Sequence, residues 1–293
     1  MTYLVLSVIC STIIGVVFRL FKDYEIDTFQ AIIYNYIVCL TVGSLIMGDL
    51  PVKYGFWTLD WFPYAAVLGG IFISAFILIA KTVQNYGISI TSVVQRMSLI
   101  ITVSFAIIYF QESLSIFKII GIISALGAVV LASFKNEKKE ISDTTTPKKW
   151  LILLPISVLL TSGLIECVLQ YVEGTILKGS VGQLQFTTVL FGTAAVIGTI
   201  ILIFSLLTGR MTFKIKNLIA GIALGVPNFG SIYFLLAMLG IGWERSVVFP
   251  INNIAVILFS TFVALLFFKE KLSKLNWMGI ILAILAIVLI AYA

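Results

Sequence analysis

Ten apolar segments follow one another along this chain of 293 residues, and each is long enough to cross a bilayer as a helix. A bilayer core about 30 Å thick needs roughly 20 apolar residues per helical span. Within that core only helices and closed barrels satisfy the backbone without water. We therefore predict an all-α integral membrane protein with ten transmembrane helices, at about 3–18, 29–47, 62–80, 88–109, 116–134, 150–171, 182–207, 217–239, 246–268 and 275–292.

The composition agrees with a membrane protein and narrows its partners. Hydrophobic residues make up 60% of the chain and charged residues 11%, against about a quarter charged in soluble domains. The basic residues behind the net charge of +6 lie mainly in short loops between apolar segments. We therefore expect contact with membrane lipid and no binding of nucleic acid. The cysteines lie inside the segments, where they behave as small apolar residues.

One motif occurs twice, with a displacement of 158 positions. The first copy reads Phe110-Gln111-Glu112-Ser113-Leu114 and is followed by Gly121; the second reads Phe268-Lys269-Glu270-Lys271-Leu272 and is followed by Gly279. Each copy closes one apolar segment and opens the next, so the duplicated unit is a membrane module. We predict a first five-helix repeat at 1–134, a basic linker at 135–149 and a second five-helix repeat at 150–293.

The orientation of the two repeats follows from their odd number of spans. A second copy of five helices must enter the membrane in the opposite sense from the first, so the repeats are predicted to be inverted. If both termini were cytoplasmic, the cytoplasmic loops would hold only Lys53, Lys118, Lys178 and Arg245, and fourteen basic residues would face outward. Because basic residues favour cytoplasmic loops, we predict both termini outside and the linker at 135–149 in the cytoplasm.

The chain contains no histidine. This excludes a Ser-His-Asp triad, imidazole ligation of a metal and histidine acid–base catalysis. The sequence also lacks a Walker-type Gly-x-x-x-x-Gly-Lys loop. We therefore expect no enzymatic activity, no cofactor and no metal site.

A charge inside a span costs about 2.5–3.5 kcal/mol at the helix centre, so it is seldom kept without use. Arg96, beside Gln95, lies about a third of the way into the predicted fourth span, in a polar stripe formed by Thr91, Gln95, Ser98, Thr102 and Tyr109. We expect this stripe to face a water-filled cavity. Arg96 is then either a clamp for a solute carboxylate or phosphate, or a side chain that is structurally paired or reaches the interface.

The second copy carries a related polar band. The displacement of 158 matches Gln95 with Asn253 and Arg96 with Ile254, and Asn252 lies beside Asn253. Sites in inverted-repeat transporters lie near the midplane where the repeats meet, so we expect this band to bind the solute. Further candidates for a cavity lining are Tyr34, Asn35 and Asn228.

Glu166 is the one carboxylate well inside a predicted span, with Ser162, Gln170 and Glu173 at helical spacing around it. It is a candidate for proton coupling, because an intramembrane carboxylate can alternate between ionised and neutral forms. The alternative is a structural role, as an ion pair with Arg96 or as a hydrogen-bonded carboxyl.

Small residues recur at helical spacing in the fifth and tenth spans. They are Gly121, Ala125 and Ala128 in the first copy, and Gly279, Ala283 and Ala286 in the second. Such residues let helices approach closely in lipid. They predict either contacts within the chain or a dimer interface.

Two inverted five-helix halves, each with an aromatic-x-Glu-x-Leu motif and a glycine nine residues after the glutamate, resemble the drug/metabolite transporter superfamily and its EamA-type group. The resemblance spans the whole chain and implies a carrier of small metabolites, often an exporter of amino acids or related compounds, in a bacterial inner (plasma) membrane. Glu112 and Glu270 match the family motif, and we expect them to fix the turns between helices. Arg96 and Glu166 lie outside it.

These observations favour a secondary transporter that exports a small polar metabolite, such as an amino acid, by alternating access, with a proton or another counter-ion as a candidate for coupling. Other readings stay open. A non-transporting membrane sensor or assembly protein would give no solute flux, and a passive channel would give flux without counterflow. A lipid-processing enzyme would need catalytic groups beyond those in the sequence.

Overall fold

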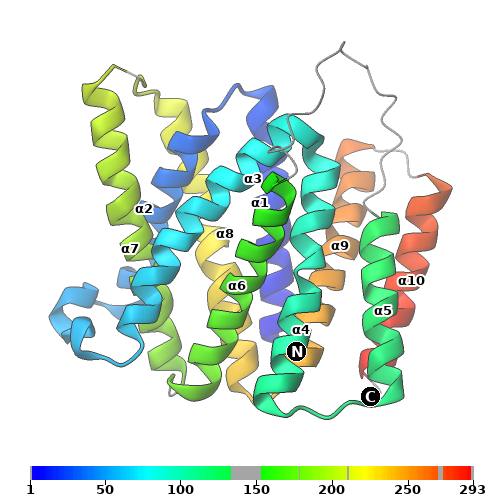
Figure 1. Cartoon of the computed structure of the whole chain (residues 1–293). Helices are drawn as coiled ribbons and strands as arrows, with labels where there is room; N and C mark the ends of the chain where they lie inside the picture. The colour runs from blue at the N-terminus through cyan, green and yellow to red at the C-terminus, as the bar shows by residue number, and fades with distance from the viewer. Residues whose placement is uncertain (1, 133–152, 178, 210, 270–272, 292–293) are drawn as a thin grey trace. The chain divides into compact units, whose positions relative to one another are not determined.

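The computed structural model describes residues 2–132, 153–177, 179–209, 211–269 and 273–291. Over these ranges the chain is all-helical (Figure 1). The predicted linker at 135–149 and the second motif glutamate, Glu270, lie outside the described residues. The helices are α1 (Thr2–Asp23), α2 (Thr28–Met47), α3 (Phe62–Met97), α4 (Leu99–Phe110), α5 (Ile116–Ala132), α6 (Leu153–Thr175), α7 (Gly179–Leu207), α8 (Ile215–Gly240), α9 (Arg245–Phe268) and α10 (Lys274–Ala291), with short 3-10 turns at Pro51–Tyr54 and Phe56–Thr58.

Ten α-helices within the described ranges confirm the predicted fold class. By length and composition, seven of them contain a stretch able to cross a membrane, and three shorter apolar helices lie at Val94–Phe110, Ile116–Leu131 and Lys274–Ile290. The protein is an integral membrane protein with multiple apolar spans.

The boundary between the third and fourth helices differs from the prediction. We expected a break between residues 80 and 88, where polar residues interrupt the apolar pattern. The backbone is instead helical from Phe62 to Met97, and the break comes at Ser98. This polar stretch contains no proline to remove a backbone donor, and the Thr82 hydroxyl bonds the Leu78 carbonyl of the preceding turn at 2.7 Å. Arg96 therefore lies in the last turn of α3 and not a third of the way into a fourth span.

The contacts divide the chain into two compact units, each built from both halves of the sequence. Unit 1 comprises residues 1–76 and 168–243, and unit 2 comprises residues 77–167 and 244–293. Each unit therefore combines helices from the first predicted repeat with helices from the second. The division passes through α3 and α6, which contribute residues to both units.

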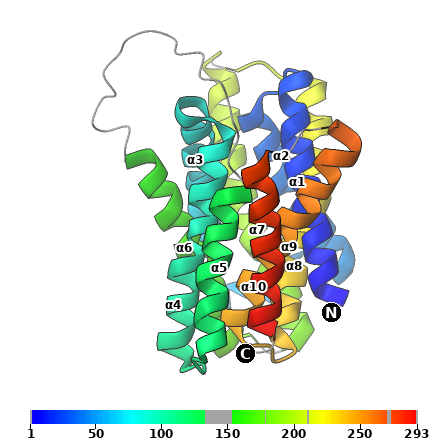
Figure 2. The same cartoon turned by 90° about the vertical axis from the view of Figure 1, so that its right-hand side faces the viewer.

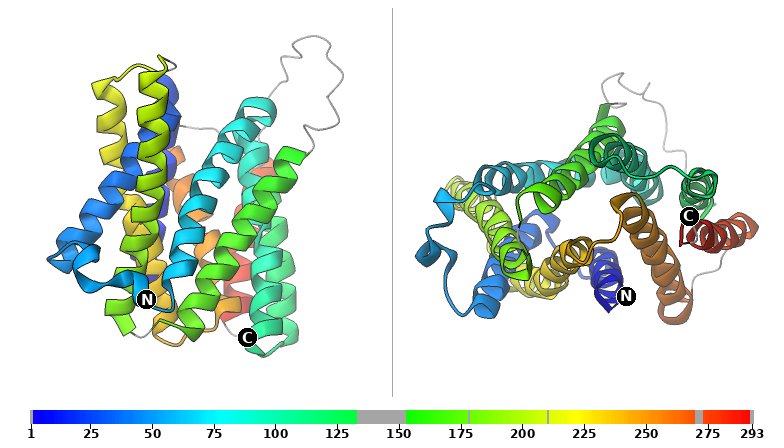
Figure 3. Two further views of the ribbon diagram at one scale, coloured as in Figure 1. Left: turned by 60° about the vertical axis from the view of Figure 1, so that its left-hand side comes forward. Right: turned by 90° about the horizontal axis from the view of Figure 1, so that it is seen from below.

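In unit 1, α8 packs against α1 and α2, and α7 packs against α2 (Figure 3). Glycines permit the closest of these approaches. A Cβ atom added at Gly221 would lie 2.9 Å from the Ala31 carbonyl oxygen, and one at Gly225 would lie 2.9 Å from the Asn35 carbonyl oxygen. These two glycines, four residues apart on α8, let its backbone touch that of α2, as small residues do in membrane helix pairs.

In unit 2, α5 packs along α10 (Figure 2), and α4 packs against α9. The small residues predicted to mediate contacts serve the α5–α10 pair. A Cβ atom added at Gly121 would lie 2.6 Å from Ile290 and 3.3 Å from the Ala286 carbonyl oxygen. Ala125 and Ala283 are fully buried.

The packed pairs α4–α9, α5–α10 and α2–α7 all join helices that correspond at the displacement of 158. The repeat extends to backbone conformation. Gln111 ends α4 with φ of 55°, and Lys269, at the matching position, ends α9 with φ of 50°. Both are left-handed residues without the freedom of glycine, so the duplicated motif encodes the same helix ending twice.

Candidate functional site

Arg96 and Asn253, which come from matching regions of the two repeats, meet in unit 2. The Arg96 guanidinium donates from Nη1 to the Asn253 side-chain oxygen at 3.2 Å and to its backbone oxygen at 3.4 Å. The Arg96 side chain is half-buried at the end of α3, and Asn253 lies on α9. These hydrogen bonds join α3 and α9 through two residues that lie 157 positions apart in the sequence.

The residues adjacent in sequence to Arg96 and Asn253 differ in solvent exposure. Ile254, the repeat counterpart of Arg96, is fully buried, whereas Gln95 is exposed. Asn252 is half-buried, and within the described part of the chain its side-chain oxygen is shielded from solvent without a hydrogen-bond donor. A buried acceptor without a donor is costly to leave unsatisfied.

Glu166 on α6 faces two hydroxyl groups. Its Oε2 atom accepts a short hydrogen bond from Thr102 and one of 3.4 Å from Ser98. Close helix packing permits this contact. Gly163, one turn before Glu166, faces Ile101 of α4 so closely that an added Cβ would lie 2.8 Å from the isoleucine Cδ1 atom.

Ser98 connects the two charged residues. It lies at the break between α3 and α4, two residues after Arg96, and its hydroxyl donates to Glu166. Arg96 and Glu166 also interact electrostatically. Each charged group nonetheless has hydrogen-bond partners of its own, Asn253 for the arginine and the two hydroxyls for the glutamate.

The candidates in the other unit form a separate, buried cluster. The Asn228 amide donates to the Asn35 side-chain oxygen at 3.1 Å, and the Cys39 thiol donates to the Gly225 carbonyl oxygen at 3.2 Å. Tyr34 is 8% exposed and packs within unit 1 beside α8. These bonds tie α2 to α8, and they satisfy polar groups that would otherwise be buried without partners.

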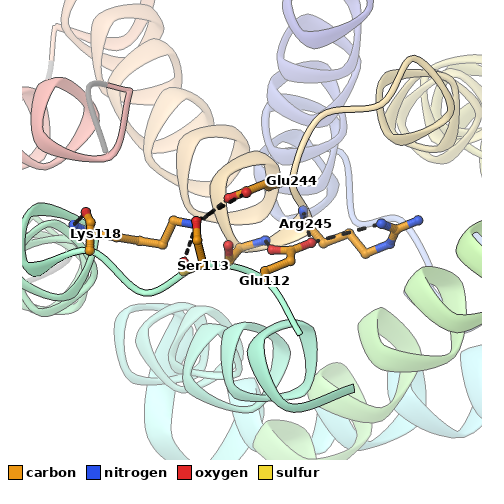
Figure 4. Close-up of polar contacts among 7 residues, drawn as sticks. Glu112, Ser113, Lys118, Glu244 and Arg245 are labelled. Atoms are coloured by element: carbon orange, nitrogen blue, oxygen red, sulfur yellow. Dashed lines mark hydrogen bonds and ion pairs between the residues drawn. The ribbon is translucent and has the colours of Figure 1, made fainter. Parts of the chain in front are cut away.

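The motif residue Glu112 reaches beyond its own turn. Its carboxylate accepts hydrogen bonds from the backbone N–H groups of Arg245 at 2.7 Å and of Ser246 at 2.8 Å, at the start of α9 (Figure 4). The first N–H groups of a helix have no partner within the helix, and a negative charge there is favourable. Glu112, in the first repeat, therefore caps a helix of the second.

An ion pair between a buried lysine and an exposed glutamate, which the sequence did not suggest, lies beside this cap. Lys118, only 1% exposed, pairs with Glu244 and donates to the Ser113 carbonyl oxygen at 2.8 Å (Figure 4). Arg245 stacks over the Phe110 ring at 4.0 Å from its centroid. The only sequence signal was the clustering of charges around the motif, since residues 118 and 244 lie far apart along the chain.

Among the residues that the structure describes, no group of three or more histidine, cysteine or acidic side chains is placed to hold a metal ion. The chemistry available at the Arg96 site is therefore that of a guanidinium, amides, hydroxyls and one carboxyl.

Comparison with known proteins covers nearly the whole chain. A family model described as the EamA-like transporter family matches residues 1–134 and 171–292. A protein of Haemophilus influenzae (strain ATCC 51907 / DSM 11121 / KW20 / Rd), described as uncharacterized, is 30% identical over 300 residues, which cover 99% of this chain and 97% of the relative. A solved crystal structure has a TM-score of 0.74 and 12% identity, covering 98% of this chain and 94% of that one; it shows a shared fold.

Proposed function

Because this chain belongs to the EamA-like transporter family, we propose that it exports a small polar metabolite that carries a carboxylate, such as an amino acid, by alternating access. The protein is a membrane transporter and not an enzyme. The solute class, the direction and the mechanism are our proposal. The observation that carries it is the hydrogen bond between Arg96 and Asn253.

Arg96 supplies the main attraction for the solute. A guanidinium offers five donors in a planar fork that matches a carboxylate. Within the described part of the chain, both of its hydrogen bonds leave from Nη1, so Nη2 and Nε remain as a pair of donors for the solute.

The amides of Asn252 and Asn253 suit the rest of a polar solute. Asn253 orients the arginine. In this proposal the oxygen of the adjacent Asn252, which has no hydrogen-bond donor among the described residues, accepts a hydrogen bond from an ammonium or hydroxyl group. An amino acid carries a carboxylate and an ammonium group close together, and this pair matches the guanidinium and the amide oxygen.

Alternating access requires the site to exchange its opening from one side of the membrane to the other. The boundary between α3 and α4 at Ser98, two residues after the arginine, is the point that we assign to this movement. Helix ends absorb changes in backbone angles more easily than helix interiors do. We expect α4 to reorient about Ser98 as the solute passes.

Counterflow in proteoliposomes tests the proposal. L-alanine, L-glutamate and L-lactate are tested separately. Vesicles loaded with one of these solutes in unlabelled form should transiently accumulate the same solute when it is added outside with a label. A channel would equilibrate the label without accumulation, and a sensor or assembly protein would give no flux. Either result would overturn the proposal.

A thermal-stability screen of the purified protein identifies the solute class. A ligand at 100 times its Kd stabilises the folded form by about 2.7 kcal/mol. Carboxylate-bearing compounds should raise Tm, whereas sugars and organic cations should leave it unchanged.

A further inference from the structure

We infer that this transporter couples its solute to a proton by exchanging the counter-charge of Arg96. When a solute carboxylate binds the guanidinium, it takes over the electrostatic role of Glu166, and Glu166 binds a proton. Carboxylate and proton then cross the membrane together. This inference rests on the proposed function and adds its coupling ion and the order of charge movements.

The two charges are arranged for such an exchange. Arg96 and Glu166 interact electrostatically inside one unit, and Ser98 lies between them in the chain. Arg96 and Glu166 make their hydrogen bonds to other residues: the arginine donates to Asn253, and the glutamate accepts from Ser98 and Thr102. The guanidinium is thus compensated by a nearby carboxylate without being blocked by it.

The partners of Glu166 tolerate both of its protonation states. A hydroxyl group can donate to an ionised carboxylate and can accept from a protonated carboxyl. Thr102 and Ser98 are therefore able to keep Glu166 in place before and after proton binding. Among the described residues, the other titratable groups that interact electrostatically with this region are Arg96 of α3 and the Cys167 thiol of α6.

Charge balance makes the two binding events cooperative. With Arg96 and Glu166 both ionised, the pair has no net charge. A solute whose only charge is a carboxylate, such as L-lactate, would leave an uncompensated negative charge among apolar helices, which is costly. Protonation of Glu166 restores neutrality, so a carboxylate and a proton each favour the binding of the other.

The arrangement exists in one copy only. At the displacement of 158, Arg96 corresponds to Ile254 and Glu166 corresponds to Val8, and both apolar residues are buried. The charged pair therefore occurs in one copy of the repeat, which is compatible with a single solute site.

The proton balance is simple. A proton from water on one side binds a carboxylate oxygen of Glu166 as the solute binds Arg96. On the other side the solute leaves, the proton returns to water and the ionised glutamate again compensates the arginine. No covalent bond to the solute forms or breaks.

The experiment uses proteoliposomes of the full chain that contain a trapped pH-sensitive dye. L-lactate, L-alanine and L-glutamate are added outside, each as a gradient, and lactamide serves as the matched probe without a carboxylate. L-lactate, whose only charge is a carboxylate, should acidify the lumen when it is exchanged. L-alanine, a zwitterion without net charge, and lactamide should not. The apparent affinity of wild-type protein for L-lactate should rise as the pH falls, by at most about tenfold per pH unit for one coupled proton.

Variants separate the coupling from transport. Glu166→Gln should still exchange the carboxylate, but without acidifying the lumen and without the pH dependence. The same substitution at Glu25, whose side chain is 91% exposed, should behave as wild type. If Glu166→Gln does not fold, Thr102→Val keeps the carboxyl group but removes a donor to its ionised form, so the pH midpoint of exchange should move upward.

The outcomes distinguish the two proposals. Exchange of L-lactate without acidification, or equal acidification by lactate and lactamide, would overturn the coupling and leave the transporter proposal intact. An unchanged pH midpoint in Thr102→Val would also count against the coupling. If the wild-type protein exchanged none of L-lactate, L-alanine and L-glutamate, the proposed function itself would be overturned.

Discussion

Substitution of Glu112 by glutamine tests whether the family motif works as a cap between the repeats. The carboxylate accepts from the N–H groups of Arg245 at 2.7 Å and Ser246 at 2.8 Å, and its side chain is only 7% exposed. Glutamine has one oxygen in place of two, so one of these N–H groups would face the amide nitrogen and lose its acceptor.

The cost can be worked from these contacts. A hydrogen bond to a charged group contributes about 1.5–3 kcal/mol, and a charge at a helix N-terminus adds about 0.3–1 kcal/mol. Glu112→Gln should therefore destabilise the protein by about 2–4 kcal/mol. At the 2–4 °C per kcal/mol typical of domains of 150–250 residues, this corresponds to a fall in Tm of roughly 4–16 °C.

Thermal unfolding of the purified protein in detergent measures the effect. Glu25→Gln is the matched control, because Glu25 lies at 3.8 Å from Lys216 in an exposed ion pair, and such pairs contribute about 0–1 kcal/mol. A Tm for Glu112→Gln equal to that of Glu25→Gln would refute the capping role and leave the motif glutamate unexplained.

Three further substitutions examine the packing of α6 and the Lys118–Glu244 ion pair in unit 2. Gly163→Val should push α6 away from Ile101, destabilise the protein by about 1–3 kcal/mol as overpacking does, and impair exchange by displacing Glu166; an unchanged Tm and exchange rate would contradict this. Lys118→Met should lower the free energy of unfolding less than Glu244→Gln does. The lysine is buried, so removal of its partner would leave an uncompensated buried charge. Thermal unfolding of both variants checks the order, and an equal or larger loss for Lys118→Met would contradict it.

The sequence was sufficient for the fold because apolar length and internal repetition are strong signals. Helix α9 was predicted at 246–268 and runs from Arg245 to Phe268. The boundary before α4 was missed, because a polar stretch within a helix and a loop look alike when the partners of the polar side chains are unknown. The break at Ser98 has no side-chain cap to mark it.

The site was predictable in part. Displacement of the repeat matched Gln95 with Asn253, and the structure brings Asn253 to the neighbouring Arg96. The pairing of Glu166 with Thr102 was not predictable, since it depends on the close approach of α6 to α4 at Gly163. Such an approach is a property of packing and leaves no regular spacing in the sequence.

The same limit applies to the glutamate motif. Its spacing placed Glu112 at a helix end beside basic residues, which suggested a role within that turn. The carboxylate instead binds the start of α9, more than 130 positions along the chain. The N–H groups at a helix start always need hydrogen-bond acceptors from outside the helix, but the tertiary fold decides which segment supplies them.

Counterflow by Arg96→Gln, compared with wild type for L-lactate and for lactamide, tests the central claim most directly. A lost charge-assisted hydrogen bond of about 1.5–3 kcal/mol corresponds to roughly 10- to 150-fold in affinity. We predict a loss in this range for exchange of the carboxylate and little change for the amide. An equal loss for both solutes, or no loss for either, would contradict a solute site at Arg96.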